Sequence, residues 1–139
     1  MSSIYLQCIV RRRNIRTIRD LEKSDALWLT SVRRKIIDAV TKTYLGIASN
    51  QLKLYVHCEW GFSFSADKDL PSYFHFHIHV THVDFDGGYG QAAGRAILLE
   101  NLISQLDCLS TGKQLSDCTV AYTIGENNEL WRDVLQYSA

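Results

Sequence analysis

The sequence predicts an α+β fold, in which an antiparallel β-sheet has two helices packed to one side. Several short segments alternate apolar and polar residues, as strands do, whereas two longer segments repeat apolar residues every three or four positions, as helices do. The helical segments do not alternate regularly with the strands, and some strands are joined by short links. This order favours an antiparallel sheet with helices on one side.

The N-terminal third of the chain predicts one strand followed by one long helix. Residues 4–10 alternate with apolar side chains on both faces, which is typical of a strand in the interior of a sheet. Residues 24–45 repeat apolar side chains at spacings of four. Ser24 or Asp25 can cap the first turn of this helix, and Gly46 is placed to end it.

The rest of the chain predicts three further strands and a second helix. Residues 52–57 and 73–83 alternate as strands, and the glycine-rich stretch DFDGGYGQ that follows them predicts turns. Residues 92–106 carry one leucine-rich stripe and predict a helix, and residues 119–124 predict a last strand. The chain has one proline and no repeat, so residues 1–139 are expected to form a single domain.

Composition limits the classes of partner. The 15 basic residues balance the 15 acidic ones, so no global field draws the chain to long nucleic acid or to an anionic membrane. The four cysteines are scattered and form no CxxC pair, which predicts reduced thiols in the cytosol or nucleus. The N-terminal apolar stretch precedes the arginines, the reverse of a secretory signal, and is too short to span a bilayer. A cytoplasmic protein, present also in the nucleus, is therefore expected.

The stretch LPSYFHFHIHVTHV, residues 70–83, contains the residues on which the functional prediction depends. Successive side chains of a strand point to opposite faces, so His75, His77 and His79 are expected to share one face. Phe76 and Ile78 then lie on the opposite, core face. A fold under selection for stability alone would place β-branched residues at the three histidine positions, because an imidazole needs a polar partner when it is buried.

Two kinds of chemistry fit this pattern. In the first, two of the histidines and His57 from the preceding strand bind a zinc ion, since three successive side chains of one straight strand cannot all converge on one metal. In the second, the flanking imidazoles bind phosphoryl oxygens and the central one attacks phosphorus. The second suits the geometry better, because a polyphosphate is itself extended and can contact several donors that are spaced along a strand.

The motif HFHIHV resembles the signature of the histidine triad superfamily of nucleotide hydrolases and transferases. The stretches IYLQCIVRRRNIRTIRDL, NQLKLYVH, LPSYFHFHIHV and GRAILLENLISQL further resemble the C-terminal half of the scavenger mRNA decapping enzymes. The resemblance covers almost all of this chain and about half of the family's chain. It implies a histidine-triad-like α+β fold and a homodimer.

The resemblance also implies an activity and a set of site residues. The activity is hydrolysis of an acid anhydride, in which an m7GpppN cap dinucleotide or short capped oligonucleotide is cleaved to 7-methylguanosine monophosphate and a nucleoside diphosphate. Neither a metal nor a cofactor is implied. His77 is the implied nucleophile, and a nucleotidyl-histidine is the intermediate. The residues implied to contact the phosphates and the leaving group are His57, Ser72, Tyr73, His75 and His79.

Several features leave alternatives open. Residues 58–70 are longer than the family's connection and form either a hairpin loop or a lid bearing aromatic side chains. No segment corresponds to the family's base-recognising N-terminal domain, so the chain is either an excised C-terminal domain or a short relative. Its function is then decapping, general hydrolysis of nucleotides or phosphoramidates, or nucleotide binding with little turnover. The sequence assigns no role to four arginines, Arg11, Arg12, Arg13 and Arg95.

Overall fold

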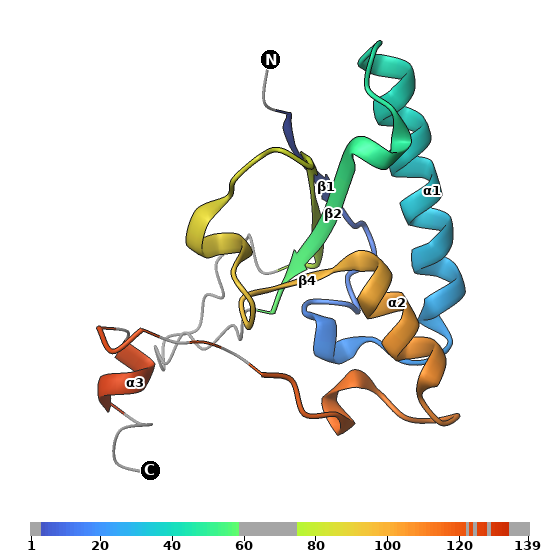
Figure 1. Ribbon diagram of the computed structural model, residues 1–139. Helices are drawn as coiled ribbons and strands as arrows, with labels where there is room; N and C mark the ends of the chain where they lie inside the picture. Colours follow the sequence, from blue (N-terminus) through green and yellow to red (C-terminus); the bar gives the residue numbers. More distant parts are fainter. Residues whose placement is uncertain (1–3, 59–74, 122, 124, 128, 134–139) are drawn as a thin grey trace.

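The computed structural model describes residues 4–58, 75–121, 123, 125–127 and 129–133. Within these residues the chain forms a four-stranded antiparallel sheet in the order β1-β3-β2-β4 (Figure 1). The strands are β1 (Tyr5–Ile9), β2 (Leu52–His57), β3 (His77–His82) and β4 (Ala96–Leu98). The helices are α1 (Asp25–Thr43), α2 (Leu99–Cys108) and the short α3 (Glu129–Asp133).

Helices α1 and α2 pack on one face of the sheet, as predicted for this α+β fold (Figure 1). Their apolar stripes meet the alternate side chains of β2 and β3 in one core. Its most buried members include Leu29 of α1, Leu99, Leu102 and Leu106 of α2, and Leu54, Val56, Ile78 and Val80 of the sheet. Because β2 and β3 use every second residue for this core, their remaining side chains project from the opposite face of the sheet.

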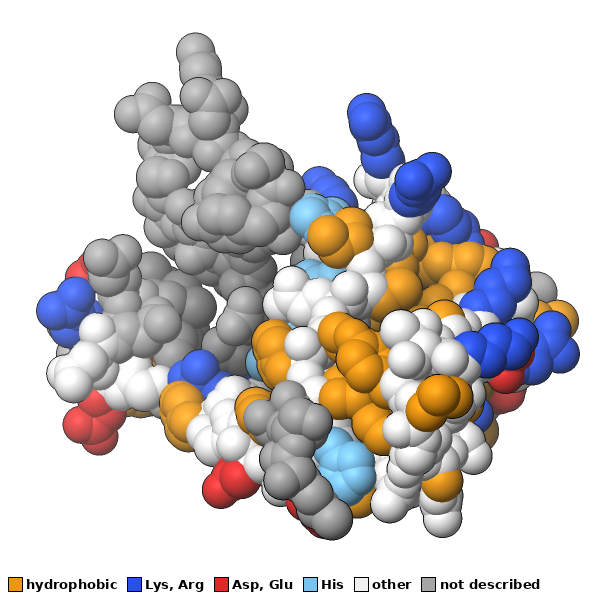
Figure 2. Space-filling view, turned by 90° about the horizontal axis from the view of Figure 1, so that it is seen from above, with side chains coloured by type: hydrophobic (Ala, Val, Ile, Leu, Met, Phe, Trp, Pro, Cys, Tyr) orange, Lys and Arg blue, Asp and Glu red, His pale blue; other side chains and the backbone are white. Residues whose placement is uncertain are grey.

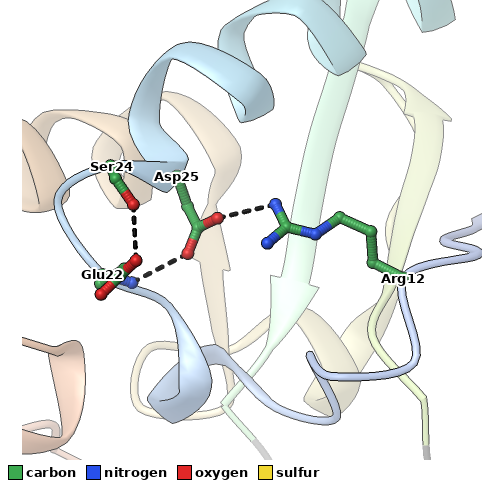
Figure 3. A network of polar contacts seen from close by, with 4 residues as sticks. All are labelled: Arg12, Glu22, Ser24 and Asp25. Atoms are coloured by element: carbon green, nitrogen blue, oxygen red, sulfur yellow. Dashed lines mark hydrogen bonds and ion pairs between the residues drawn. The ribbon is translucent and has the colours of Figure 1, made fainter.

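The start of α1 is held by a buried carboxylate. Asp25, which is 5% exposed, accepts hydrogen bonds from the backbone N–H of Glu22 and from the guanidinium of Arg12 (Figure 3). The Ser24 hydroxyl donates to the Glu22 carboxylate and does not cap the helix. Of the two capping residues that the sequence suggested, Asp25 therefore organises the turn, and it does so from the first position inside the helix.

The end of α1 agrees with the sequence. The helix stops at Thr43, and Gly46 follows with a φ of +97°, in the left-handed region that glycine enters without strain.

Two sequence predictions about the sheet are wrong. The strand at residues 4–10 was expected in the interior, but β1 lies at the edge of the described sheet and pairs only with β3. The predicted helix at 92–106 begins only at Leu99, because residues 96–98 form β4 and pair with β2. Pairing with a neighbouring strand outweighs local helical periodicity here.

The remaining strand predictions also change in extent. The strand expected at 73–83 is observed at residues 77–82, and residues 73 and 74 lie outside the described part of the chain. No strand is present among the described residues of the segment 119–124. Instead, the backbone N–H of Thr123 donates to the carbonyl of Gly94, which ties this segment to the turn before β4.

The surface and the thiols are consistent with the composition. On the face seen in Figure 2, Lys and Arg side chains stand in separate groups, and acidic side chains lie beside several of them. All four cysteines are free thiols, and burial raises the pKa of Cys8 and Cys58. None of the described helices combines the length and the apolar character needed to cross a membrane.

Candidate functional site

Four histidines lie together on the face of the sheet that is turned away from α1 and α2. His77 and His79 come from β3, His57 ends β2, and His75 lies two residues before the start of β3. The centre of the His79 ring lies 4.5 Å from that of His57 and 4.8 Å from that of His77. The His75 and His77 ring centres are 6.1 Å apart. The predicted alternation and the pairing of β2 with β3 therefore bring the four imidazoles into one continuous group, named here the histidine group.

A cavity of about 410 Å³ opens beside this group. His57, His75 and His77 line one part of it, and Arg16 and Thr17 from the turn after β1 line another. Described side chains that complete the lining are Gln7, Ile9, Ile18, Val56 and Phe76. The cavity thus joins three imidazoles and a guanidinium, which are groups that bind phosphate oxygens.

The tautomer of His77 follows from its hydrogen bond. Its Nδ1 lies 3.0 Å from the backbone carbonyl oxygen of His75. A carbonyl oxygen can only accept, so Nδ1 carries the proton and donates. In the neutral ring Nε2 then holds a lone pair. His77 is therefore the member of the group arranged to act as a nucleophile.

His79 is the most buried member of the group, with 3% of its surface exposed. Burial, followed by the neighbouring His57 and His77, lowers its pKa from 6.5 to about 4, so the ring is neutral at pH 7. The Tyr5 hydroxyl lies 2.8 Å from its Nδ1, and the Tyr55 ring stacks on it with centres 5.0 Å apart and planes 9° apart. Its Nε2 is buried and has no hydrogen-bond partner among the described residues.

A segment between β3 and β4, residues 84–95, lies over part of the same face and is named here the crossing segment (Figure 1). Lys53 of β2 donates hydrogen bonds to the carbonyl of Phe85 and to the side chain of Gln91. A Cβ added to Gly90 would lie 3.8 Å from Cε1 of His57, in ordinary van der Waals contact, so this part of the segment lies beside that ring. The glycine-rich stretch thus covers one flank of the histidine group.

A family model described as "Scavenger mRNA decapping enzyme C-term binding" matches residues 1–94. These residues contain β1, α1, β2, β3 and the whole histidine group. The chain belongs to this family.

Curated relatives agree with the family match. An m7GpppX diphosphatase of Schizosaccharomyces pombe is 35% identical over 139 residues, which are 100% of this chain and 41% of the relative. One from Ascaris suum is 30% identical over 132 residues, which are 95% of this chain and 39% of the relative. One from Homo sapiens is 31% identical over 108 residues, which are 78% of this chain and 28% of the relative. The chain therefore spans about two fifths, or less, of the length of these relatives.

For this scavenger decapping domain, the structure assembles four of the six expected site residues. His57, His75 and His77 line the cavity, and His79 lies buried beside them. Ser72 and Tyr73 lie outside the described residues, as do residues 59–70 of the longer connection. The zinc arrangement had been left open by the sequence, and no group of three or more His, Cys, Asp or Glu side chains in the described part of the chain could hold a metal ion.

The arginines now differ in their surroundings. Arg12 pairs with Asp25 and lies over the Trp28 ring, 4.6 Å from its centre, so it belongs to the fold and not to the histidine group. The guanidinium of Arg95 lies 3.9 Å from the centre of the Tyr89 ring. Arg11 and Arg13 are exposed.

Sequence reasoning missed several residues of the site. Tyr5, Lys53 and Tyr55 alternate with apolar core positions on β1 and β2, so their strand patterns place them on the histidine face. The alternation in the sequence could therefore have identified these three residues. Arg16 belongs to the basic stretch RRRNIR, whose arginines could contact phosphates, whereas Thr17 had no sequence signal, because only the turn after β1 carries it back to the cavity.

Proposed function

We propose that this chain carries the catalytic site of a scavenger-type decapping hydrolase, which cleaves an m7GpppN cap dinucleotide or a short capped oligonucleotide to 7-methylguanosine monophosphate and a nucleoside diphosphate. The observation that supports it most directly is the Nδ1–H bond of His77, which leaves a lone pair on Nε2 beside a cavity that also contains His57 and His75. The names of the relatives, m7GpppX diphosphatases, support the choice of substrate.

The proposed reaction has two displacement steps at phosphorus. Nε2 of His77 forms a bond to the phosphorus next to the methylguanosine, and the bond from that phosphorus to the bridging oxygen of the nucleoside diphosphate breaks. Water then attacks the same phosphorus, the P–N bond breaks, and 7-methylguanosine monophosphate leaves. While the ring is nucleotidylated it is cationic, and the His75 carbonyl that accepts from Nδ1 stabilises this charge.

The other imidazoles supply hydrogen-bond donors without adding a full charge at every position. His79 is neutral at pH 7, because its pKa lies at about 4. His57 and His75 are proposed to contact nonbridging phosphate oxygens, and Arg16 is placed to meet an anionic substrate in the cavity.

The proposal extends to assembly and compartment. It includes that the protein forms a homodimer and that it is located in the cytoplasm, with a nuclear pool. A short capped substrate fits better than long RNA, because the 15 basic and 15 acidic residues produce no excess charge for binding an extended phosphate backbone.

The test is to incubate the chain with a methylated cap dinucleotide in the presence of a chelator, and to compare it with a His77→Asn variant. We expect release of 7-methylguanosine monophosphate by the wild type and a loss of at least about 1,000-fold in the variant. His82→Asn is the matched control, because His82 lies in the same strand but pairs with Asp84 away from the cavity. Full activity of the His77 variant, or activity abolished by the chelator, would contradict the proposal.

Two further measurements separate the alternatives left by the sequence. Faster turnover of an adenosine phosphoramidate than of the cap dinucleotide would indicate a general nucleotide hydrolase. Binding of the cap without turnover, together with no covalent nucleotidyl-His77 detectable by mass spectrometry, would indicate a nucleotide-binding module.

A further inference from the structure

We propose that Tyr5 is a positioning residue that selects the tautomer of His79, so that His79 presents an N–H at Nε2 while the adjacent His77 presents a lone pair there. The inference rests on the proposed function, since the N–H of His79 would serve as a donor to the phosphate chain. It assigns a role to a residue of the edge strand β1 that lies outside the expected site.

The contact joins two neighbouring strands. In the pairing of β1 with β3, Gln7 lies opposite His79 and Tyr5 lies opposite Thr81, so Tyr5 reaches His79 diagonally on the same face. The Tyr5 hydroxyl oxygen is 2.8 Å from Nδ1 of His79, and the two ring centres are 5.7 Å apart. The Phe85 ring of the crossing segment lies 5.8 Å from the Tyr5 ring. The phenol is therefore held against His79 by its own hydrogen bond and by ring packing.

The direction of this hydrogen bond follows from acidity. A phenol, with a pKa of about 10, is a stronger donor than the N–H of a neutral imidazole, and an imidazole nitrogen is a stronger acceptor than a phenol oxygen. The side-chain amide of Gln7 also approaches the phenol oxygen as a donor, at 3.5 Å. Tyr5 therefore donates to Nδ1 of His79. Since the ring is neutral at pH 7, its single proton lies on Nε2.

The consequence is a pair of adjacent imidazoles in opposite tautomers. The ring centres of His77 and His79 are 4.8 Å apart. The His75 carbonyl places the proton of His77 on Nδ1, and the Tyr5 hydroxyl places that of His79 on Nε2. That Nε2 is buried, and within the described residues nothing accepts its hydrogen. A phosphoryl oxygen brought beside His77 would provide the missing acceptor, and the opposite tautomer would direct a lone pair at that oxygen.

The first measurement is the protonation state of each ring nitrogen. Long-range ¹H–¹⁵N NMR of the full chain at pH 7 distinguishes a protonated from an unprotonated imidazole nitrogen. We expect Nε2–H for His79 and Nδ1–H for His77 in the wild type. In Tyr5→Phe, which keeps the ring but lacks the hydroxyl, we expect the His79 signals to move towards the Nδ1–H form while those of His77 stay unchanged. Tyr44→Phe, at the far end of α1, is the control and should move neither.

The second measurement is the hydrolysis of the cap dinucleotide. Tyr5→Phe is expected to lower kcat by about 100-fold, the low end of the range for losing one aligned donor, with a smaller change in KM. Tyr44→Phe should keep the wild-type rate. The unfolding midpoint in urea of each variant shows whether a loss arises from general destabilisation.

The outcomes separate this inference from the proposed function. A wild-type His79 protonated at Nδ1, or a Tyr5→Phe variant with unchanged His79 signals, would overturn the inference whatever the activity. Unchanged kcat in Tyr5→Phe despite a changed tautomer would overturn its link to catalysis. If the wild type does not hydrolyse the cap, the proposed function fails, the link to catalysis fails with it, and the nitrogen signals alone decide the tautomer selection.

Discussion

Lowering the pH should destabilise this domain through His79 in a way that can be calculated. The folded-state pKa of His79 is lowered from 6.5 to about 4, first by burial and then by His57 and His77. Below pH 6.5 the unfolded chain takes up a proton that the folded chain does not accept until about pH 4. Stability is therefore fully present above pH 6.5 and is lost progressively as the pH falls towards 4.

The size of the effect follows from the two pKa values. Each pH unit by which they differ is worth about 1.4 kcal/mol, so the linkage relation predicts a loss of about 2 kcal/mol from His79 between pH 7.5 and pH 5.0. The ring is 3% exposed, so solvent screening reduces this value little. A loss of this size is a sizeable part of the total stability of a small domain.

The assay is urea unfolding of the wild type and of His79→Gln at both pH values. The variant loses the Tyr5 contact and is expected to be less stable at either pH, so only the change between the two pH values is compared. Other titrating groups contribute to both proteins, and subtracting the two changes isolates His79. Equal pH dependence in the two proteins would refute the proposed burial of a neutral imidazole.

Three further predictions concern stability, each measured by urea unfolding at pH 7.5. Arg12→Met should cost about 1–3 kcal/mol, because it leaves the Asp25 carboxylate, whose side chain is 7% exposed, without its cation. Leu102→Ala should cost about 2–5 kcal/mol, because Leu102 is fully buried in the core. Arg33→Ala should cost less than about 1 kcal/mol, because its ion pair with Glu100 is exposed on both sides. Similar losses in the Arg12 and Arg33 variants would contradict the ranking by burial.

Local periodicity predicted the elements whose own residues face the core. The spacing of apolar residues in α1 and the alternation in β2 are both confirmed, because burial of one face is what selects those patterns. The same alternation correctly placed His77 and His79 opposite the core residues Ile78 and Val80.

The errors arose where backbone pairing decided the structure. The leucine-rich stripe of residues 92–106 suggested an earlier helix start, but residues 96–98 pair with β2. The side chains of residues 96–98 do not themselves indicate this pairing. Apolar residues on both faces of residues 4–10 suggested an interior strand. In the structure β1 lies at the edge of the described sheet, and Tyr5 on one of its faces contacts His79.

The sequence by itself determined the α+β class, the shared face of the histidines and the resemblance to the scavenger decapping family, because these depend on residue types at short spacings. Only the tertiary structure decided which contacts the imidazoles make. The tautomer of His77 depends on the carbonyl of His75, and that of His79 on a phenol 74 positions away in the chain. A ring nitrogen takes its role from the hydrogen-bond partner of the other nitrogen, and that partner is chosen by strand pairing.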